Sequence, residues 1–147
     1  MKYTTGSVGR VVTIRFEEDD PIYDGIVNVA QAEGIASGMV WLIGGVKNGV
    51  VVVGPSDDRM PPIPMVKRFT DPREIAGIGT FFPDKNGVPS LHIHASVGKG
   101  DEVITGCPRK GLDCWLVTEA VIMEMKDLAA KRMENERSGF SLLEITG

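Results

Sequence analysis

The chain has 147 residues, 42% of them hydrophobic and 24% charged, with a formal net charge of −4 at pH 7. This length fits one domain, residues 1–147, with a sizeable core. The acidic balance argues against a protein that holds nucleic acid through its phosphates, since such proteins usually carry a basic patch. The apolar run Val40–Val53 is interrupted by Gly44, Gly45 and polar residues, so it does not predict a membrane span.

The N-terminal segment has neither an apolar core nor a small-residue cleavage site, so we expect no signal peptide. Two cysteines without an export signal predict reduced thiols and a cytoplasmic location. Cys107 and Cys114 could also pair with each other, but nothing in the sequence requires a disulfide.

The first elements in the chain are a strand and a helix. Val8–Phe16 contains GRVVTIRF, which is β-branched and partly alternating, as in a strand. Asp20 and Pro21 predict a helix start, with Asp20 as N-cap and Pro21 at the first helical position. Gly34 fits the position just after the helix. An apolar helical face is predicted by the spacing of Ile22, Ile26, Val29 and Ala30.

Two apolar runs follow, Met39–Val46 and Val50–Val53. The Asn48-Gly49 pair between them predicts a tight hairpin, because both residues tolerate positive φ. Gly44-Gly45 inside the first run indicates a bulge or a close backbone approach. Gly54–Pro64 contains four prolines and predicts a loop or an edge segment.

The second half reads mostly as strands. Ile75–Phe82 predicts a strand and Pro83–Pro89 a turn with a second Asn-Gly pair. Alternation in Leu112–Lys126 favours a strand, although its Met, Glu and Lys residues also suit a helix. Asp127–Arg137 is helix-like and charged, with Arg132 in a solvated segment. Phe140–Ile145 predicts a last strand.

Together these elements predict an α+β fold in a single domain. The expected architecture is a central, mostly antiparallel sheet of about seven to eight strands with one main helix.

Both histidines of the chain, His92 and His94, lie in SLHIHASVGKGDEVITGC, which reads as a hairpin over residues 90–107. Side chains two residues apart on a strand share a face, roughly 6.5–7 Å apart along it. If Val97 faces Glu102 across the turn, Cys107 falls opposite His92. A register shift of two keeps Cys107 on the histidine face, whereas an odd shift removes it.

His92, His94 and Cys107 are therefore the candidate metal ligands. Two imidazoles and a thiolate suit zinc, and three protein ligands leave a fourth position for water, substrate or a residue of another subunit. The alternative is an exposed sheet face that carries two polar histidines beside a small buried cysteine. Glu119 and Cys114 are possible further ligands, but the sequence does not place them nearby.

The segment LHIHASVGKGDEVITG resembles the signature of the PPC domain, the plant and prokaryote conserved domain. The signature consists of a Leu-His-x-His strand, a Gly-Asp turn and a small residue followed by Gly. The resemblance extends from Val8 to Ile145, and its other pieces follow in order: GRVVTIRF, AEGIASG, LIGGVKNGVVVVG, TEAVIMEM and SGFSLLEI.

The resemblance implies a compact α+β domain with a central antiparallel sheet, assembled as a homotrimer. It also implies a metal at the paired histidines, here His92 and His94, as in several members. The family often has a third histidine after the glycine step, where this chain has Cys107, which still suits zinc. In plants the domain adjoins AT-hooks, whose Arg-Gly-Arg-Pro core is absent here, and stand-alone prokaryotic members are commonly named as candidate DNA-binding proteins.

Three functional hypotheses remain. The first is a homotrimeric binding module that holds a metal ion or a small ligand at the His92/His94/Cys107 hairpin and acts with a protein partner. The second is a metal-dependent enzyme in which Glu119 or Glu102 is the base for a metal-bound water. The third is a transcription-associated DNA-binding protein, against which the net charge and the missing AT-hook argue.

Other residues have two readings each. Glu119 is either this base or a surface or interface carboxylate. Trp41 and Trp115 either line a ligand pocket or belong to the core. Met60–Met65 is either a subunit contact or a plain loop.

Overall fold

The computed structural model describes residues 1–109 and 111–146, so residues 110 and 147 of the expected domain lie outside the described part. In chain order the elements are β1 (Ser7–Phe16), α1 (Ile22–Ala32), β2 (Gly38–Lys47), β3 (Gly49–Pro55), β4 (Pro64–Phe69), β5 (Arg73–Pro83), β6 (Pro89–Lys99), β7 (Glu102–Pro108), β8 (Asp113–Lys126), β9 (Ala130–Asn135) and β10 (Phe140–Ile145).

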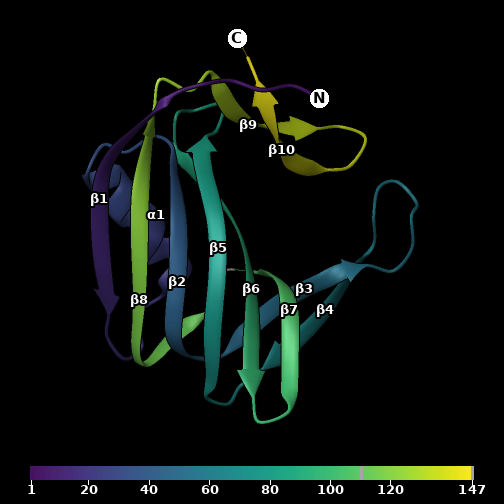
Figure 1. The fold of residues 1–147 in the computed structure, drawn as a ribbon. Helices are drawn as coiled ribbons and strands as arrows, with labels where there is room; N and C mark the ends of the chain where they lie inside the picture. Colours follow the sequence, from purple (N-terminus) through teal and green to yellow (C-terminus); the bar gives the residue numbers. More distant parts are fainter. Residues whose placement is uncertain (110, 147) are drawn as a thin grey trace.

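Eight strands form one sheet in the order β1-β8-β2-β5-β6-β7-β3-β4, and every neighbouring pair is antiparallel (Figure 1). β9 and β10 form a separate two-stranded sheet. The α+β class, the antiparallel central sheet and the one main helix are confirmed. No helix among the described residues is long and apolar enough to cross a membrane.

Helix α1 covers one face of the sheet, which we call the inner face (Figure 1). Its apolar side is buried as predicted, at Ile22, Ile26 and Ala30. Gly34 ends the helix with φ +65°, and the backbone N–H of Ile35 donates to the carbonyl of Ala30 at 2.8 Å. The predicted stop is confirmed, because this left-handed conformation suits glycine.

The predicted helix start is displaced by one residue. Pro21 occupies the N-cap, and no side chain caps the first turn. The Asp20 carboxylate instead accepts a hydrogen bond from the Glu17 backbone N–H at 2.9 Å. Asp20 therefore stabilises the turn before the helix rather than the helix itself.

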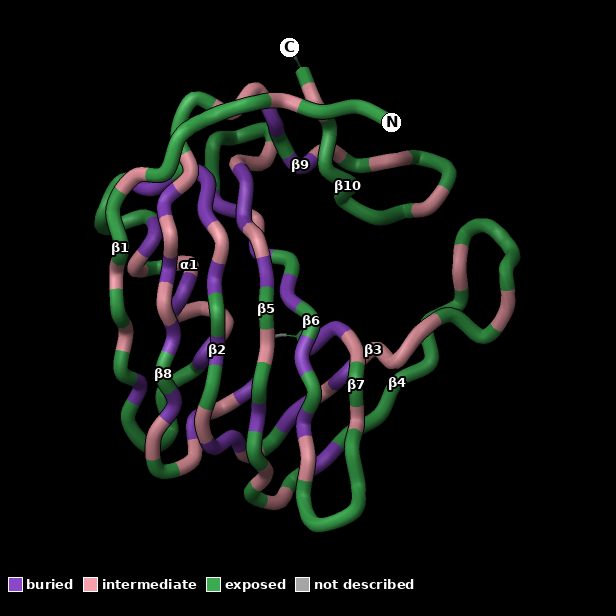
Figure 2. The backbone as a smooth tube through the Cα atoms, viewed as in Figure 1, coloured by how far each residue is buried: buried purple, intermediate pink, exposed green. Residues whose placement is uncertain are grey.

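Alternation along β2 separates the two faces of the sheet. Val40 and Leu42 are at most 1% exposed on the inner face, whereas Trp41 and Ile43 are 40% and 57% exposed on the opposite face. We call this opposite face the outer face. Buried and exposed residues alternate along the central strands in the same way (Figure 2).

The bulge and the close backbone approach predicted at Gly44-Gly45 are confirmed. Gly44 has φ +136°, and the register between β2 and β8 shifts between Gly44 and Val46. A Cβ at Gly44 would lie 2.5 Å from the carbonyl oxygen of Val117. The bulge and the close backbone approach therefore need glycine at this position.

The hairpin predicted at Asn48-Gly49 is wrong. Asn48 does turn the chain, with φ +55°, but β2 pairs with β5 and β8, while β3 pairs with β4 and β7. The chain thus leaves β2 and crosses to the far side of the sheet. The second Asn-Gly pair, Asn86-Gly87, does join two paired strands, β5 and β6.

The helix predicted over Asp127–Arg137 is also wrong. Residues 130–135 form β9, which pairs with β10. Ala130 and Arg132 are buried and flank the exposed Lys131, so the pattern has a period of two. Arg132 is only 8% exposed and is not part of a solvated segment.

Candidate metal centre

The sheet opens beside the two histidines. β7 pairs with β6 only as far as Ala95 and Gly106, and then with β3, where Cys107 faces Val52. A Cβ at Gly106 would collide with the backbone carbonyl of Val52, so the close approach of β7 to β3 requires glycine there. The part of β6 before Ala95 therefore has only β5 as a paired neighbour among the described residues.

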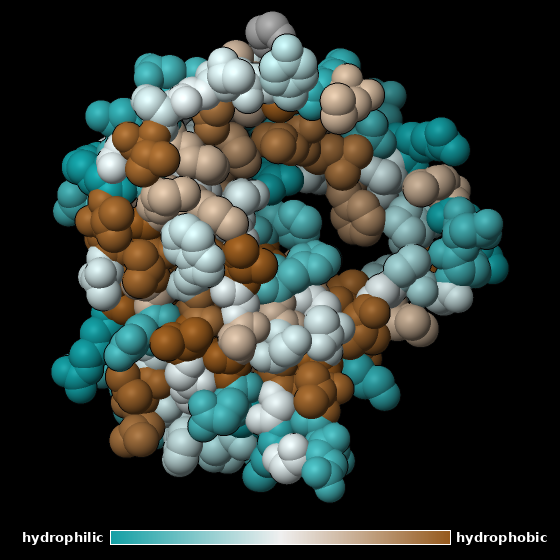
Figure 3. All heavy atoms as spheres, in the orientation of Figure 1, coloured by the Kyte–Doolittle hydropathy of each residue, from teal (hydrophilic) through white to brown (hydrophobic). Residues whose placement is uncertain are grey.

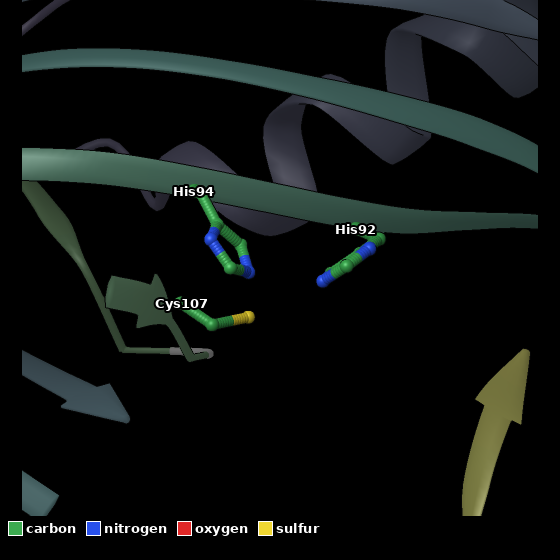
Figure 4. A group of neighbouring side chains, drawn as sticks. All are labelled: His92, His94 and Cys107. Atoms are coloured by element: carbon green, nitrogen blue, oxygen red, sulfur yellow. The ribbon is translucent and has the colours of Figure 1, made fainter. Parts of the chain in front are cut away.

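The hairpin register differs from the predicted one by two residues. Val97 faces Ile104, not Glu102. Because the shift is even, it preserves the face of each side chain. His92, His94 and Cys107 point toward one another in Figure 4.

The three side chains bring their donor atoms close together. The imidazole nitrogens of His92 and His94 and the Sγ of Cys107 lie within 4.8 Å of one another. The imidazole rings are edge-to-face, with centroids 5.0 Å apart and an interplanar angle of 87°. A tetrahedral zinc ion needs donor separations of about 3.3–3.6 Å. To bind one ion, the widest donor separation therefore needs to shorten from as much as 4.8 Å by about 1.2–1.5 Å.

The chemistry of the donors fits zinc. The set has two imidazoles and a thiol, and among the described residues it is the one group of three metal-ligating side chains. Nitrogen and sulfur donors favour zinc over magnesium or calcium. Partial burial lowers the pKa of His92, and the positive charges of Arg132, His94 and Arg109 lower it further. This keeps the imidazole in the neutral form that binds metals.

A cavity of about 820 Å³ opens at the three donors. It lies between β6, β7 and β3 on one side and the β9–β10 hairpin on the other, and Figure 3 shows the surface hollowed in this region. Met60, Pro62 and Pro64 of the proline-rich segment contribute to its wall. A cavity of this size takes a small organic molecule.

Arg132 also lines the cavity and is the functional candidate that sequence reasoning missed. Its Nη2 donates to Oγ1 of Thr80 at 3.0 Å, and its guanidinium carbon lies 5.8 Å from the ring centre of Phe82. Nε is buried without a hydrogen-bond partner among the described residues. The alternation of Ala130 and Arg132 before the turn at Ser138-Gly139 was the available signal.

The other candidates lie elsewhere. Glu119 is exposed on β8, where it faces Ile43 of β2, and Glu102 accepts a hydrogen bond from Arg73 at 3.3 Å. Cys114 is fully buried in the core, and both cysteines are free thiols. Trp41 is on the outer face. Neither tryptophan nor either glutamate lines the cavity.

Solved structures share this architecture over almost the whole chain. A metal-containing protein from Archaeoglobus fulgidus has 22% identity and a TM-score of 0.84, over 98% of this chain and 99% of that one. A plant- and prokaryote-conserved protein from Pyrococcus horikoshii has 25% identity and the same TM-score of 0.84, over 98% and 97%. A protein from Bacteroides thetaiotaomicron, named as a candidate DNA-binding protein, has 19% identity and a TM-score of 0.77, over 97% and 99%.

No curated protein sequence matches the chain. The model of the Plants and Prokaryotes Conserved (PCC) domain matches residues 3–126, which include β6, β7 and the three metal-ligating side chains. This is the family that the hairpin motif resembles. The chain therefore belongs to the Plants and Prokaryotes Conserved domain family.

Proposed function

We propose that this protein is a homotrimeric binding module that holds one zinc ion per chain through His92, His94 and Cys107. Three protein ligands leave one position open, and the adjoining cavity gives a small ligand access to it. When bound, zinc would supply a Lewis acid at the base of the cavity.

One observation carries this proposal, namely the convergence of the three donors within 4.8 Å of one another. His92 and His94 come from one strand and Cys107 from another, beyond the point where the strands diverge. Gly106 permits this divergence, so the local backbone supports the position of the thiol. The similar protein from Archaeoglobus is itself described as metal-containing, which is in line with the proposal.

A binding role fits the cavity better than catalysis or DNA binding. A hydrolytic site needs a base within hydrogen-bond reach of its water, and no Asp or Glu is among the described residues that line the cavity. DNA binding through phosphates needs a positive surface, whereas the chain has a net charge of −4.

The trimer rests on the family resemblance and on the outer face. Hydrophobic side chains gather on this face over β1, β8, β2 and β5 (Figure 3). Among them are Val11, Trp41, Ile43 and Ile78, which are 40–65% exposed. Contact between subunits would cover them, since exposed apolar patches often mark interfaces. Glu119 would then be an interface carboxylate.

Elemental analysis of protein purified without a metal-affinity tag tests the metal centre. We expect about one zinc per chain in the wild type and almost none in His92→Ala/His94→Ala, because one remaining thiolate cannot hold the ion. Cys107→Ala and Cys114→Ala form a matched pair of buried cysteines, of which only the first is expected to lose zinc.

Two results would contradict the proposal. One is a wild-type protein that stays metal-free after dialysis against zinc. The other is a folded His92→Ala/His94→Ala protein that retains the full zinc content. Light scattering tests assembly separately, and a monomer at micromolar concentration would contradict the trimer.

A further inference from the structure

Arg132 is a buried cation that has no countercharge among the described residues. It is 8% exposed, and no carboxylate of the described residues forms an ion pair with it. Its Nη2 donates to the neutral hydroxyl of Thr80, and its Nε–H has no hydrogen-bond partner among the described residues. Arginine is rarely buried this far unless it is paired, because the desolvation of the charge is costly.

Another buried charge in the same protein, the Glu124 carboxylate, shows the usual arrangement. Glu124 is also 8% exposed, and it accepts three hydrogen bonds from Arg10, through the backbone N–H, Nε and Nη2, at 2.9–3.2 Å. At Glu124 the chain therefore provides the partner of a buried charge. Arg132 faces a cavity instead.

The cavity has the opposite charge balance to the whole chain. Arg109 and Arg132 line it together with the two histidines, and no acidic side chain is among its described lining residues. The full chain carries a net charge of −4. A zinc ion bound by two neutral imidazoles and one thiolate would add a further net positive charge. The site is thus locally positive and able to attract an anion.

Much of the remaining wall is apolar. The polar groups are concentrated near β6 and Arg132, while hydrophobic residues come from β3, the proline-rich segment and β10. The apolar contributors include Val52, Val53, Pro55, Met60, Phe140 and Leu142.

We infer that the cavity binds a small organic carboxylate, whose anionic group pairs with Arg132 and whose apolar body lies along β3 and the β9–β10 hairpin. A planar guanidinium matches a carboxylate with two parallel hydrogen bonds, and Nε–H of Arg132 has no hydrogen-bond partner among the described residues. Arg109, which is exposed at the cavity, adds positive charge. Another polar group of the ligand would occupy the open position on zinc. Only this second contact rests on the proposed function.

Matched pairs of acid and amide test this charge preference. Ligand-observed NMR on the wild-type protein, zinc-loaded, would compare benzoate with benzamide, phenylacetate with phenylacetamide, and 4-phenylbutyrate with 4-phenylbutyramide. Each amide has nearly the shape of its acid but lacks the charge. We expect the acid to bind at least about tenfold more tightly than its amide in the pairs that fit, because hydrogen bonds to an ionised group are the strong ones.

Variants locate the effect. Arg132→Gln is expected to abolish the difference between acid and amide, whereas Arg137→Gln, an exposed arginine near the tip of the same hairpin, is expected to keep it. Circular dichroism and light scattering check that each variant folds and assembles. Arg109→Gln changes an exposed residue and is expected to reduce the preference in part.

Three results would overturn the inference: acids that bind no better than amides in every pair, acids that do not bind at all, or a folded Arg132→Gln protein with an unchanged preference. The same NMR comparison of acids and amides on zinc-free His92→Ala/His94→Ala protein separates this inference from the metal proposal. Zinc binding without acid preference would contradict the inference alone. The wild type could instead bind no zinc and still prefer acids in a way that depends on Arg132. This result would support the carboxylate inference and contradict the metal centre.

Discussion

The two faces of the eight-stranded sheet differ most clearly at Leu42 and Ile43, which are neighbours on β2. Leu42 is 1% exposed under α1 on the inner face, and Ile43 is 57% exposed on the outer face. The chain covers the inner face with its own helix. On the outer face, β9 packs against β5, and its Arg132 contacts Thr80.

This difference separates the stabilising core from the groups of the proposed function. The inner face has a continuous buried core, whereas the outer face carries the apolar patch and the two cavity-lining histidines, His92 and His94. Polar and charged groups that would destabilise the core are placed where the sheet opens. An outer face that is left uncovered by the chain is available to other subunits and to ligands.

The largest expected effect comes from a cavity in the inner face. Leu42→Ala should lower the free energy of unfolding by about 2–5 kcal/mol, as large-to-small substitutions in cores do. Urea denaturation measures this change. The difference in unfolding free energy between the variant and the wild type should be the same at every protein concentration. A loss below about 1 kcal/mol would mean that Leu42 is not part of a tightly packed core.

On the outer face, an added charge should affect assembly rather than folding. Ile43→Lys with Ile78→Lys should convert the proposed trimer into a folded monomer, since it would place two added charges in an apolar contact between subunits. Light scattering and circular dichroism measure the two properties. Val88→Lys is the control, because Val88 is exposed in the turn between β5 and β6. Persistence of the trimer in the double variant would place the interface elsewhere.

Gly106 connects the fold to the proposed metal centre. Gly106→Ala should weaken zinc binding by at least about tenfold, because the new Cβ would collide with Val52 and move Cys107. Gly98→Ala, on the same hairpin, is the control: its Cβ would come no closer than 3.5 Å to its nearest neighbour. A competition titration with a zinc chelator measures both, and equal affinities would contradict the proposed role of the glycine.

A smaller effect on stability is expected from the Glu124 carboxylate, which pairs with Arg10 on the inner side of the sheet. Arg10 lowers the pKa of Glu124 from 4.5 to about 2, chiefly through its hydrogen bonds. Because the folded state lowers this pKa, the pair stabilises the protein above pH 4.5 and loses its effect as the pH falls toward 2. Glu124→Gln should be less stable at neutral pH and should lose less stability over that acid range. Denaturation curves at several pH values test this, and parallel pH profiles would contradict it.

Much of the fold follows from local patterns in the sequence. The helix at Ile22, the bulge at Gly44 and the strand containing His92 and His94 were predictable because spacing, glycine and alternation determine them locally. The face shared by His92, His94 and Cys107 was also predictable, because a register error of two residues leaves every side chain on the same face of the sheet.

Long-range pairing explains the failures. The Asn48-Gly49 turn has the chemistry of a hairpin, but β2 is paired on both sides by β5 and β8, so β3 pairs elsewhere. The charged residues of β9 suit a helix, yet pairing with β10 and burial against the outer face favour a strand. Arg132 was missed for the same reason. Its role depends on a cavity that forms only when distant strands meet.

X-ray absorption at the zinc edge of the purified protein reads out the ligands of the proposed metal centre. Coordination by His92, His94 and Cys107 predicts one sulfur at about 2.3 Å and two imidazole nitrogens at about 2.0–2.1 Å, with one further light atom. Addition of a carboxylate that binds should change only the light-atom shell. A spectrum with no sulfur ligand, or with oxygen ligands alone, would show that His92, His94 and Cys107 do not form the metal centre.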